Sequence, residues 1–352
     1  MNSAGPAPRP GGRRPAVTLH DVAKAAGVSV ATASHVANGR TDVRMSDRTR
    51  QRVQATIDEL GYRSNALAKH LVKGSSQFIG LVADAIATTP FAGQIISGAQ
   101  DEAWRHGFVL LVANTDSDTA VETEAIEMML DHRVRGILYS TWFHRRVTVP
   151  SGLPIADTVL VNCYSEDDAV RSVVPNEVQG GRAATEMLLA QGHRRIAMVN
   201  TVTESPARVG RLQGYRQALE AYGVPFDPTL VIDAVSDQEG GYDAYDRIRA
   251  SGASAVFCHN DRVAMGLYDA VRVRGLKIPG DLAVVGFDNQ DVISAHLRPP
   301  LSTVQLPHYE LGAAGIRVLL GHEKPAPGAT MRLDCPAVVR DSVRAVVPRT
   351  AS

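Results

Sequence analysis

The segment from Leu19 to Asn38 carries side chains of the types that contact base edges in DNA. His35 can donate a hydrogen bond to a guanine acceptor, while Val30 and Ala31 can touch thymine methyl groups. At helical spacing these residues share one face with Ser34, and we expect that face to enter a major groove. Four short polar residues near the expected helix ends suit phosphate oxygens, which fix the register of a protein on DNA: Thr18, Ser29, Thr32 and Asn38.

A second group of residues with binding chemistry follows apolar runs later in the chain. Asp and Asn side chains can bind pairs of sugar hydroxyls, and an aromatic face such as Phe91 or Trp142 can stack on a pyranose. Many such residues act instead as helix caps, and for Asp261, just before a helix expected from Arg262, we expect a cap. The carboxyl ends of parallel strands meet at one edge of a sheet. The group expected there comprises residues 84–91, Asn114, Asp116, residues 140–143, Asn162, and residues 200–205, 260–261 and 288–289.

Three short helices are expected to position the first group. Thr18, Ser29 and Ser46 can cap their N-termini, and Asp21 gives Thr18 an imperfect capping box. Tightly crossing helices need small or apolar residues inside and a flexible residue at the turn. This pattern predicts a helix-turn-helix, although a small helical bundle would show similar apolar spacing. The inward and turn positions are Val22, Ala23, Ala26, Gly27, Val28, Ala33 and Val36, and Asn38–Gly39 and Gly61 are expected to end the second and third helices.

After residue 74, buried apolar runs alternate with amphipathic helical segments, which predicts parallel βαβ units. About 270 residues exceed one such sheet, so we expect two doubly wound lobes facing a cleft. The expected strands are Phe78–Ala83, Val109–Ala113, Gly136–Tyr139, Thr158–Asn162, Ile196–Asn200, Ala255–Cys258 and Leu282–Phe287. The expected helices include Phe91–His106, Ala120–His132, Glu177–Ala190, Arg208–Tyr222, Gly240–Ala250 and Arg262–Arg274.

Charge is divided unevenly along the 352 residues, although the 37 Lys and Arg balance the 37 Asp and Glu. Residues 1–74 carry 12 basic and 5 acidic side chains, a net charge of +7, which leaves −7 for the remainder. A basic head on an acidic body indicates that the head meets a polyanion. Residues 1–16 have too little apolar content to fold and read as a disordered tail.

The composition and motifs of the chain argue against several classes of protein. No apolar run is long enough to span a membrane, and the N-terminus lacks the apolar core of a secretory signal. Three widely spaced cysteines without a CxxC pair argue for a reducing compartment, the cytoplasm, and against a cysteine zinc site. GxGxxG at the first βα unit, GxxxxGK[ST], GxSxG and HExxH are all missing. We therefore expect neither an enzyme nor a bound cofactor or metal.

Several segments together resemble the lactose/galactose-repressor family of bacterial transcription regulators. The resemblance begins with TLHDVAKAAGVSVATASHVANG and DELGYRSNALAKHL and covers nearly the whole chain after residue 16. It continues through GHRRIAMV, GRLQGYRQAL, the Asn260–Asp261 pair, PGDLAVVGFDN and RPPLSTV, in the order the family has them. It implies a body of two lobes like a periplasmic sugar-binding protein, and a homodimer. The homodimer would bind a near-palindromic operator in double-stranded DNA. A small effector, expected to be a sugar, would control that binding.

The same resemblance implies site residues and boundaries. Arg211, Asn260 and Asp288 are the strongest effector contacts, with Phe91 and Trp142 as further contacts. Its DNA contacts extend to Leu19, Tyr62, Asn65, Ala68 and Leu71, with Leu71 as a minor-groove wedge. We expect residues 64–72 to be disordered in the free protein and helical on DNA, whereas the residues alone would favour a plain linker. The implied domains are a helix-turn-helix at 17–63, a hinge at 64–74 and a body at 75–345, with lobe 1 at about 75–174 and 305–333 and lobe 2 at about 175–304 and 334–345.

The chain departs from the family pattern at a few positions. His35 stands where Arg is commoner, Ser64 where Pro often precedes the hinge, and Pro175 where Asp often begins the second lobe. The alternative function is a sugar-binding protein that does not act on DNA. Binding to a palindromic promoter fragment would separate the two.

Overall fold

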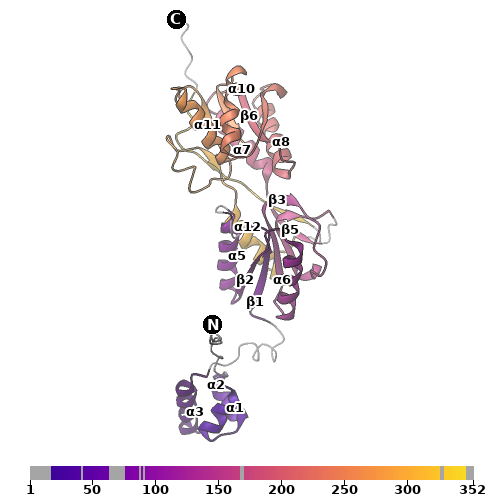
Figure 1. Cartoon of the computed structure of the whole chain (residues 1–352), viewed down its shortest axis with the longest axis vertical. Coiled ribbons are helices and arrows are strands. Elements are labelled where there is room, and N and C mark those ends of the chain that lie inside the picture. The colour runs from indigo at the N-terminus through magenta and orange to yellow at the C-terminus, as the bar shows by residue number, and fades with distance from the viewer. Residues whose placement is uncertain are drawn as a thin grey trace, which may run out of the picture. The chain divides into compact units, whose positions relative to one another are not determined.

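The computed structural model describes residues 17–40, 43–62, 76–86, 89, 92–166, 170–325 and 329–345. The chain divides into two compact units, Met1–Ser76 and Gln77–Ser352 (Figure 1). Among the described residues no helix is both long and apolar enough to cross a membrane.

The described part of the first unit contains three helices, α1 (Leu19–Ala26), α2 (Val30–Ala37) and α3 (Asp47–Leu60). Each begins at a predicted cap, because the side chains of Thr18, Ser29 and Ser46 accept hydrogen bonds from helix N–H groups. Gly27 ends α1 with φ +63°, a left-handed conformation that costs glycine little. Gly39 and Gly61 adopt the same conformation after α2 and α3, so the predicted helix ends are confirmed.

The three helices enclose one small core. Its buried members include Val22, Ala26, Ala33, Val53 and Ile57, with Val28 partly buried beside them. The predicted inward positions are therefore confirmed. Because α1 and α2 bury their apolar faces against α3, the opposite face of α2 remains exposed.

The second unit opens with a six-stranded parallel sheet in the order β11–β5–β4–β3–β1–β2. Residues alternate between its faces, so Leu81 and Val161 pack toward α5 and α12 while Val82 and Leu160 pack toward α6. The strands are β1 (Phe78–Ala83), β2 (Val109–Asn114), β3 (Ile137–Arg146), β4 (Thr158–Tyr164), β5 (Arg171–Pro175) and β11 (Thr330–Leu333). The helices are α5 (Gly93–Arg105), α6 (Thr119–Asp131) and α12 (His308–Leu319).

Helices α5 and α12 cross at very short range, which two glycines permit. A Cβ on Gly98 would lie 1.8 Å from the carbonyl oxygen of Tyr309, and one on Gly312 would lie 2.0 Å from that of Ile95. Only glycine fits at these two positions, since real Cβ atoms do not approach other atoms so closely.

A second parallel sheet follows the order β7–β6–β8–β9. Helices α7 and α8 cover one face around Tyr215 and Phe257, and α9, α10 and α11 cover the other around Val256 and Leu267. The strands are β6 (Ile196–Thr201), β7 (Val231–Ala234), β8 (Ala255–Cys258) and β9 (Ala283–Val285). The helices are α7 (Glu177–Leu189), α8 (Pro206–Ala221), α9 (Gln238–Asp243), α10 (Tyr245–Ala250) and α11 (Asp261–Val273). Two doubly wound lobes were predicted and are confirmed.

The chain passes between the two sheets three times. It does so from β5 into α7, from β10 (Thr303–Val304) into α12, and from β11 into β12 (Ala337–Val338). β10 and β12 pair antiparallel in a two-stranded ribbon. Gln94 on α5 also donates a hydrogen bond to Asp291 at 3.2 Å, which joins the first lobe to the second.

Some predicted elements differ from the structure. The strand expected at Leu282–Phe287 covers only Ala283–Val285, because the N–H groups of Gly286 and Asp288 bond to Ser302 and Val304 instead. The helix expected at Gly240–Ala250 is interrupted at Ala244. The strands β5, β7, β10, β11 and β12 and the helix α12 were not predicted.

Candidate functional site

The outer face of α2 presents the residues predicted to read base edges. Val30 is 43% exposed and Ala31 is exposed, while Ser34 and His35 are half-buried. Val30 is a large apolar side chain in water, a placement that suits contact with a partner. Leu19 and Tyr62 pack partly against the core of this unit. The remaining predicted DNA contacts, Asn65, Ala68 and Leu71, lie outside the described residues, as does the whole of the predicted hinge at 64–74.

The polar residues predicted to bind phosphates already have partners within the first unit. Thr18 forms a capping box with Asp21. Ser29 accepts a hydrogen bond from the backbone N–H of Thr32 at 3.1 Å, and Asn38 donates one to the hydroxyl of Ser34 at 3.2 Å. These bonds fix the side chains at the two ends of α2, where helix-end groups commonly meet phosphate oxygens.

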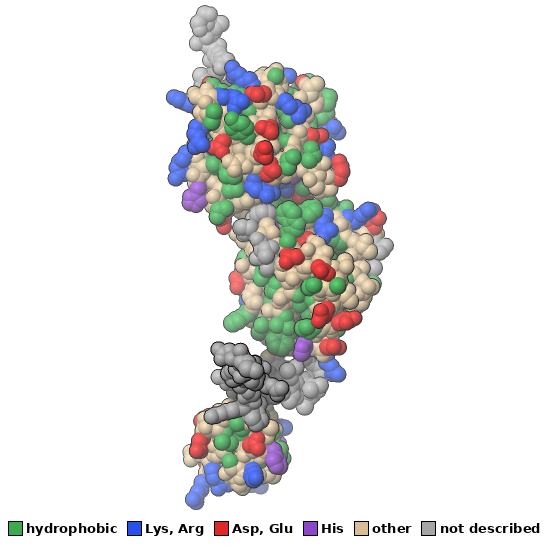
Figure 2. Space-filling view, in the orientation of Figure 1, with side chains coloured by type: hydrophobic (Ala, Val, Ile, Leu, Met, Phe, Trp, Pro, Cys, Tyr) green, Lys and Arg blue, Asp and Glu red, His purple; other side chains and the backbone are tan. Residues whose placement is uncertain are grey.

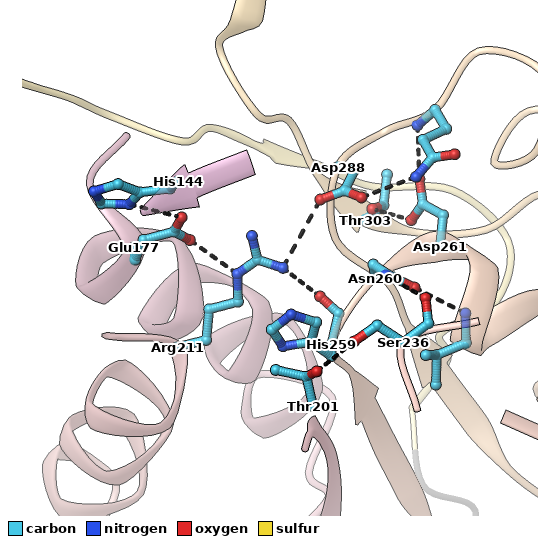
Figure 3. A network of polar contacts seen from close by, with 12 residues as sticks. His144, Glu177, Thr201, Arg211, Ser236, His259, Asn260, Asp261, Asp288 and Thr303 are labelled. Carbon is cyan, nitrogen blue, oxygen red and sulfur yellow. Dashed lines mark hydrogen bonds and ion pairs between the residues drawn. The ribbon is translucent and has the colours of Figure 1, made fainter. Parts of the chain in front are cut away.

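A cavity of about 270 Å³ is lined from both lobes of the second unit. The first lobe contributes Trp142 and Phe143 from β3, whose rings meet edge to face at 4.8 Å between centroids. The second lobe contributes the side chains of Arg211, Asn260 and Asp288 (Figure 3). The structure thus brings together four of the five predicted effector contacts, and the fifth, Phe91, lies outside the described residues.

Arg211 is the centre of a buried network (Figure 3). Its Nε donates to Glu177 at 2.8 Å, and its Nη1 donates to the backbone carbonyl of His259. Its guanidinium carbon lies 3.7 Å from the centre of the Phe287 ring. Glu177 also contacts Nδ1 of His144 at 3.3 Å. Burial acts to raise the pKa of Glu177, but the ion pair with Arg211 and the contact with His144 together outweigh it and hold that pKa low, at about 2.

Asp288 faces Arg211 without a direct hydrogen bond. Its Oδ1 lies 3.8 Å from Nη1 of Arg211, and its Oδ2 accepts from the side-chain amide of Gln290 at 2.9 Å. Burial raises the pKa of Asp288 to about 6, and Arg211 partly offsets that effect. Oδ1 is therefore an acceptor that a ligand in the cavity can reach.

Asn260 has two structural roles beside the cavity. Its side-chain oxygen caps α11 by accepting from the N–H of Val263 at 2.9 Å, and its amide donates to the carbonyl of Ser236 at 3.1 Å. The prediction that Asp261 is the helix cap is wrong. Asp261 is the first residue of the helix, and its buried carboxyl group accepts from Thr303 and from the backbone N–H of Gln290, both at 2.7 Å.

The cavity is also lined by three histidines that were not predicted from the sequence, His144, His259 and His308. Nδ1 of His259 is buried without a hydrogen-bond partner among the described residues. Burial lowers the pKa of His308 to about 4 and that of His259 well below 6.5, so both rings are neutral near pH 7. Glu177 was also missed. Glu177 could have been selected from its place at the start of α7, just beyond the end of β5, but β5 was not predicted.

The face of the second unit seen in Figure 2 carries acidic and basic side chains interspersed, without a field of one sign. No group of His, Cys, Asp and Glu side chains in the described parts of the chain could hold a metal ion.

Comparisons with known proteins agree with this architecture. Residues 18–65 match the family model described as bacterial regulatory proteins, lacI family, and residues 185–343 match the periplasmic binding protein-like domain. The chain is 35% identical to the HTH-type transcriptional regulator DegA of Bacillus subtilis, over 84% of this chain and 88% of that protein. It is 30% identical to the ribose operon repressor of Haemophilus influenzae, over 93% and 98% respectively.

A solved structure of a LacI family transcriptional regulator from Enterococcus faecium with bound ribose is also similar. Its identity to this chain is 27% and its TM-score 0.60, and the match covers 77% of this chain and all of that one. The similarities run through both the helix-turn-helix and the two-lobed body. The chain belongs to the LacI family of bacterial transcription regulators, whose members are regulators rather than enzymes.

Proposed function

We propose that the protein is a cytoplasmic homodimeric repressor whose affinity for a near-palindromic operator changes when a sugar occupies the cavity between the lobes. Residues 17–63 would bind the DNA and residues 75–345 would bind the effector. Residues 64–74 would form the hinge that connects these two parts. Val30, Ala31 and His35 would contact base edges, and Trp142, Arg211, Asn260 and Asp288 would contact the effector. The exposed face of α2 favours this function over sugar binding alone.

The observation that carries the proposal is the gap between Arg211 and Asp288. Their nearest side-chain atoms are 3.8 Å apart, too far for a hydrogen bond, although both groups are buried. One sugar hydroxyl between them would donate to Asp288 and accept from Arg211. Trp142 and Phe143 form an apolar wall on which a sugar ring can stack. A ligand touching both lobes would favour one closure angle and so bias the DNA-binding units.

The experiment is a mobility-shift titration with an Asp288→Ala variant. An operator is first selected from random DNA duplexes, and sugars and nucleosides are screened by thermal shift, beginning with D-ribose. Asp288→Ala should bind the operator as tightly as wild type without effector but lose the effector response. Asp246→Ala, which removes an exposed carboxylate on α10, should retain both. A variant that loses DNA binding but keeps normal effector affinity would contradict the proposed site.

A further inference from the structure

The charged groups of the cavity wall balance one another. Arg211 and Arg262 supply two positive charges, and Glu177 and Asp288 supply two negative ones. The side chains of Arg211 and Glu177 are each only 4% exposed, so water screens their charges weakly. The neutral rings of His259 and His308 add no positive charge near pH 7. Among the described lining residues, the Arg, Asp and Glu side chains therefore leave no excess positive charge to receive an anion.

The guanidinium of Arg211 is also geometrically committed. A phosphate or carboxylate binds arginine best through two parallel N–H groups. Here Nε donates to Glu177, Nη1 donates to the carbonyl of His259, and one face lies on the Phe287 ring. The side-on pair of N–H groups is thus occupied at Nε by Glu177, and Nη1, one half of the end-on pair, lies 3.8 Å from the carboxyl oxygen of Asp288 (Figure 3).

Glu177 contributes both to the charge balance of the lining and to the occupied N–H groups of Arg211. It is the first residue of α7, and its two carboxylate oxygens contact His144 of the first lobe and Arg211 of the second. An anion near Arg211 would also lie near the carboxylates of Glu177 and Asp288, and like charges so close repel strongly in a buried site.

We propose that Glu177 is a specificity residue that closes the cavity to anions, so that the effector is an uncharged polar molecule. Phosphorylated or carboxylated counterparts of that molecule are rejected. That the ligand of this cavity acts as an effector rests on the proposed function. The exclusion of anions, however, is a property of the cavity and is measurable before any effector is known.

The test compares inorganic phosphate binding to three full-length proteins by isothermal titration calorimetry at constant ionic strength. Glu177→Gln keeps the size of the side chain and a hydrogen-bond acceptor for Arg211 but removes the charge. Glu186→Gln is the matched control, because Glu186 pairs with Arg182 at 2.7 Å on the same helix but outside the cavity. Glu177→Gln should bind phosphate at least about tenfold more tightly than wild type, and Glu186→Gln should match wild type.

Equal phosphate affinity of Glu177→Gln and wild type would overturn the proposal, since the carboxylate would then not be what excludes anions. If Glu177→Gln does not fold, Asp288→Asn makes the same comparison, because it too removes a charge facing Arg211. D-ribose and D-ribose 5-phosphate provide a second arm. If the wild-type protein binds D-ribose 5-phosphate as tightly as D-ribose, the proposed exclusion of anions is also refuted. Failure of both sugars to bind would count against the sugar effector alone, while the phosphate comparison still decides the role of Glu177.

Discussion

Asp261 and Asp288 are bridged by a single residue, Gln290, which donates its backbone N–H to Asp261 at 2.7 Å and its side-chain amide to Asp288 at 2.9 Å. The intervening chain is strained, because Asp288 and Asn289 have φ values of 101° and 54°. Such conformations cost about 1–3 kcal/mol each and persist only when surrounding contacts impose them. Asp261 thus positions the loop that carries the carboxylate facing the cavity.

The free energy of unfolding of the second unit should fall as pH rises from 6.5 to 8. Burial and the nearby Asp288 raise the pKa of Asp261 to about 8 from its usual 3.8. In this window the folded chain therefore holds a proton at Asp261 that the unfolded chain has lost. Raising pH then destabilises the fold by up to about 1.4 kcal/mol per pH unit, and the effect levels off above pH 8. Urea unfolding in half-unit pH steps measures it.

Asp261→Asn provides the control for this pH dependence. The amide does not titrate, so the slope between pH 6.5 and 8 should flatten. Its side-chain oxygen can still accept from the N–H of Gln290 while its NH2 group donates to the hydroxyl oxygen of Thr303, so stability at pH 6.5 should stay close to that of wild type. Buried His259 and His308 destabilise the fold only as pH falls below about 6.5, outside this window. An unchanged slope in Asp261→Asn would assign the dependence to another group.

Replacing His35 with Ala should relax base preference at one position of each operator half-site. The side chain lies on the outer face of α2, where it can reach a base edge. The expected loss on the preferred operator is about 1–3 kcal/mol, measured by mobility shift against a library of single-base operator variants. Gln51→Ala, an exposed change on α3, should leave all affinities unchanged. Uniform weakening across the library by His35→Ala would identify His35 as a phosphate contact.

Asn260 should affect stability and effector binding through different atoms. Asn260→Ala removes the cap of α11 and should lower thermal stability by about 0.5–2 kcal/mol. Asn260→Ser restores a capping oxygen without the amide that contacts Ser236, so its stability should approach that of wild type. Effector affinity of Asn260→Ser, measured by calorimetry, should remain reduced. Full recovery of affinity in Asn260→Ser would show that Asn260 acts as a cap alone.

Gly98→Ala should destabilise the first lobe by about 1–3 kcal/mol through overpacking against the backbone of Tyr309. Gly93→Ala on the same helix is the matched control, because its added Cβ would meet nothing within 4 Å. Alanine favours a helix more than glycine does, so Gly93→Ala should be neutral or slightly stabilising. Thermal unfolding of both variants measures the difference, and equal stability would show that α5 and α12 can separate.

The sequence predicts elements best where the signal is local. β1 and β8 were predicted at their observed bounds, because each is a short apolar run between clear breaks. The caps at Thr18, Ser29 and Ser46 depend only on residues three positions away. By contrast, β11 reads Thr-Met-Arg-Leu and has no apolar run, so its place beside β5 comes from distant parts of the chain.

In the site, too, some residues could be selected from the sequence, whereas others are defined only by contacts between distant parts of the chain. Arg211 and Asp288 could be selected by resemblance to the family, but the buried pair of Glu177 with Arg211 could not. That pair requires α7 and α8 to pack closely, with Gly181 and Gly214 admitting each other's helix backbone. No local pattern encodes such an approach. His259 was likewise missed, because its unpartnered nitrogen is defined only by the surrounding fold.

The discontinuous construction of the first lobe has a consequence during synthesis. Its sheet face around Leu81 and Val161 is covered by α12, and its edge is completed by β11. Both elements follow the whole of the second sheet in the chain, so at about 5–20 residues per second the ribosome delivers them on the order of ten seconds after β5. The second lobe can close around its own core during that interval. The first lobe must leave an apolar face to water or to a chaperone until the last fifth of the chain emerges.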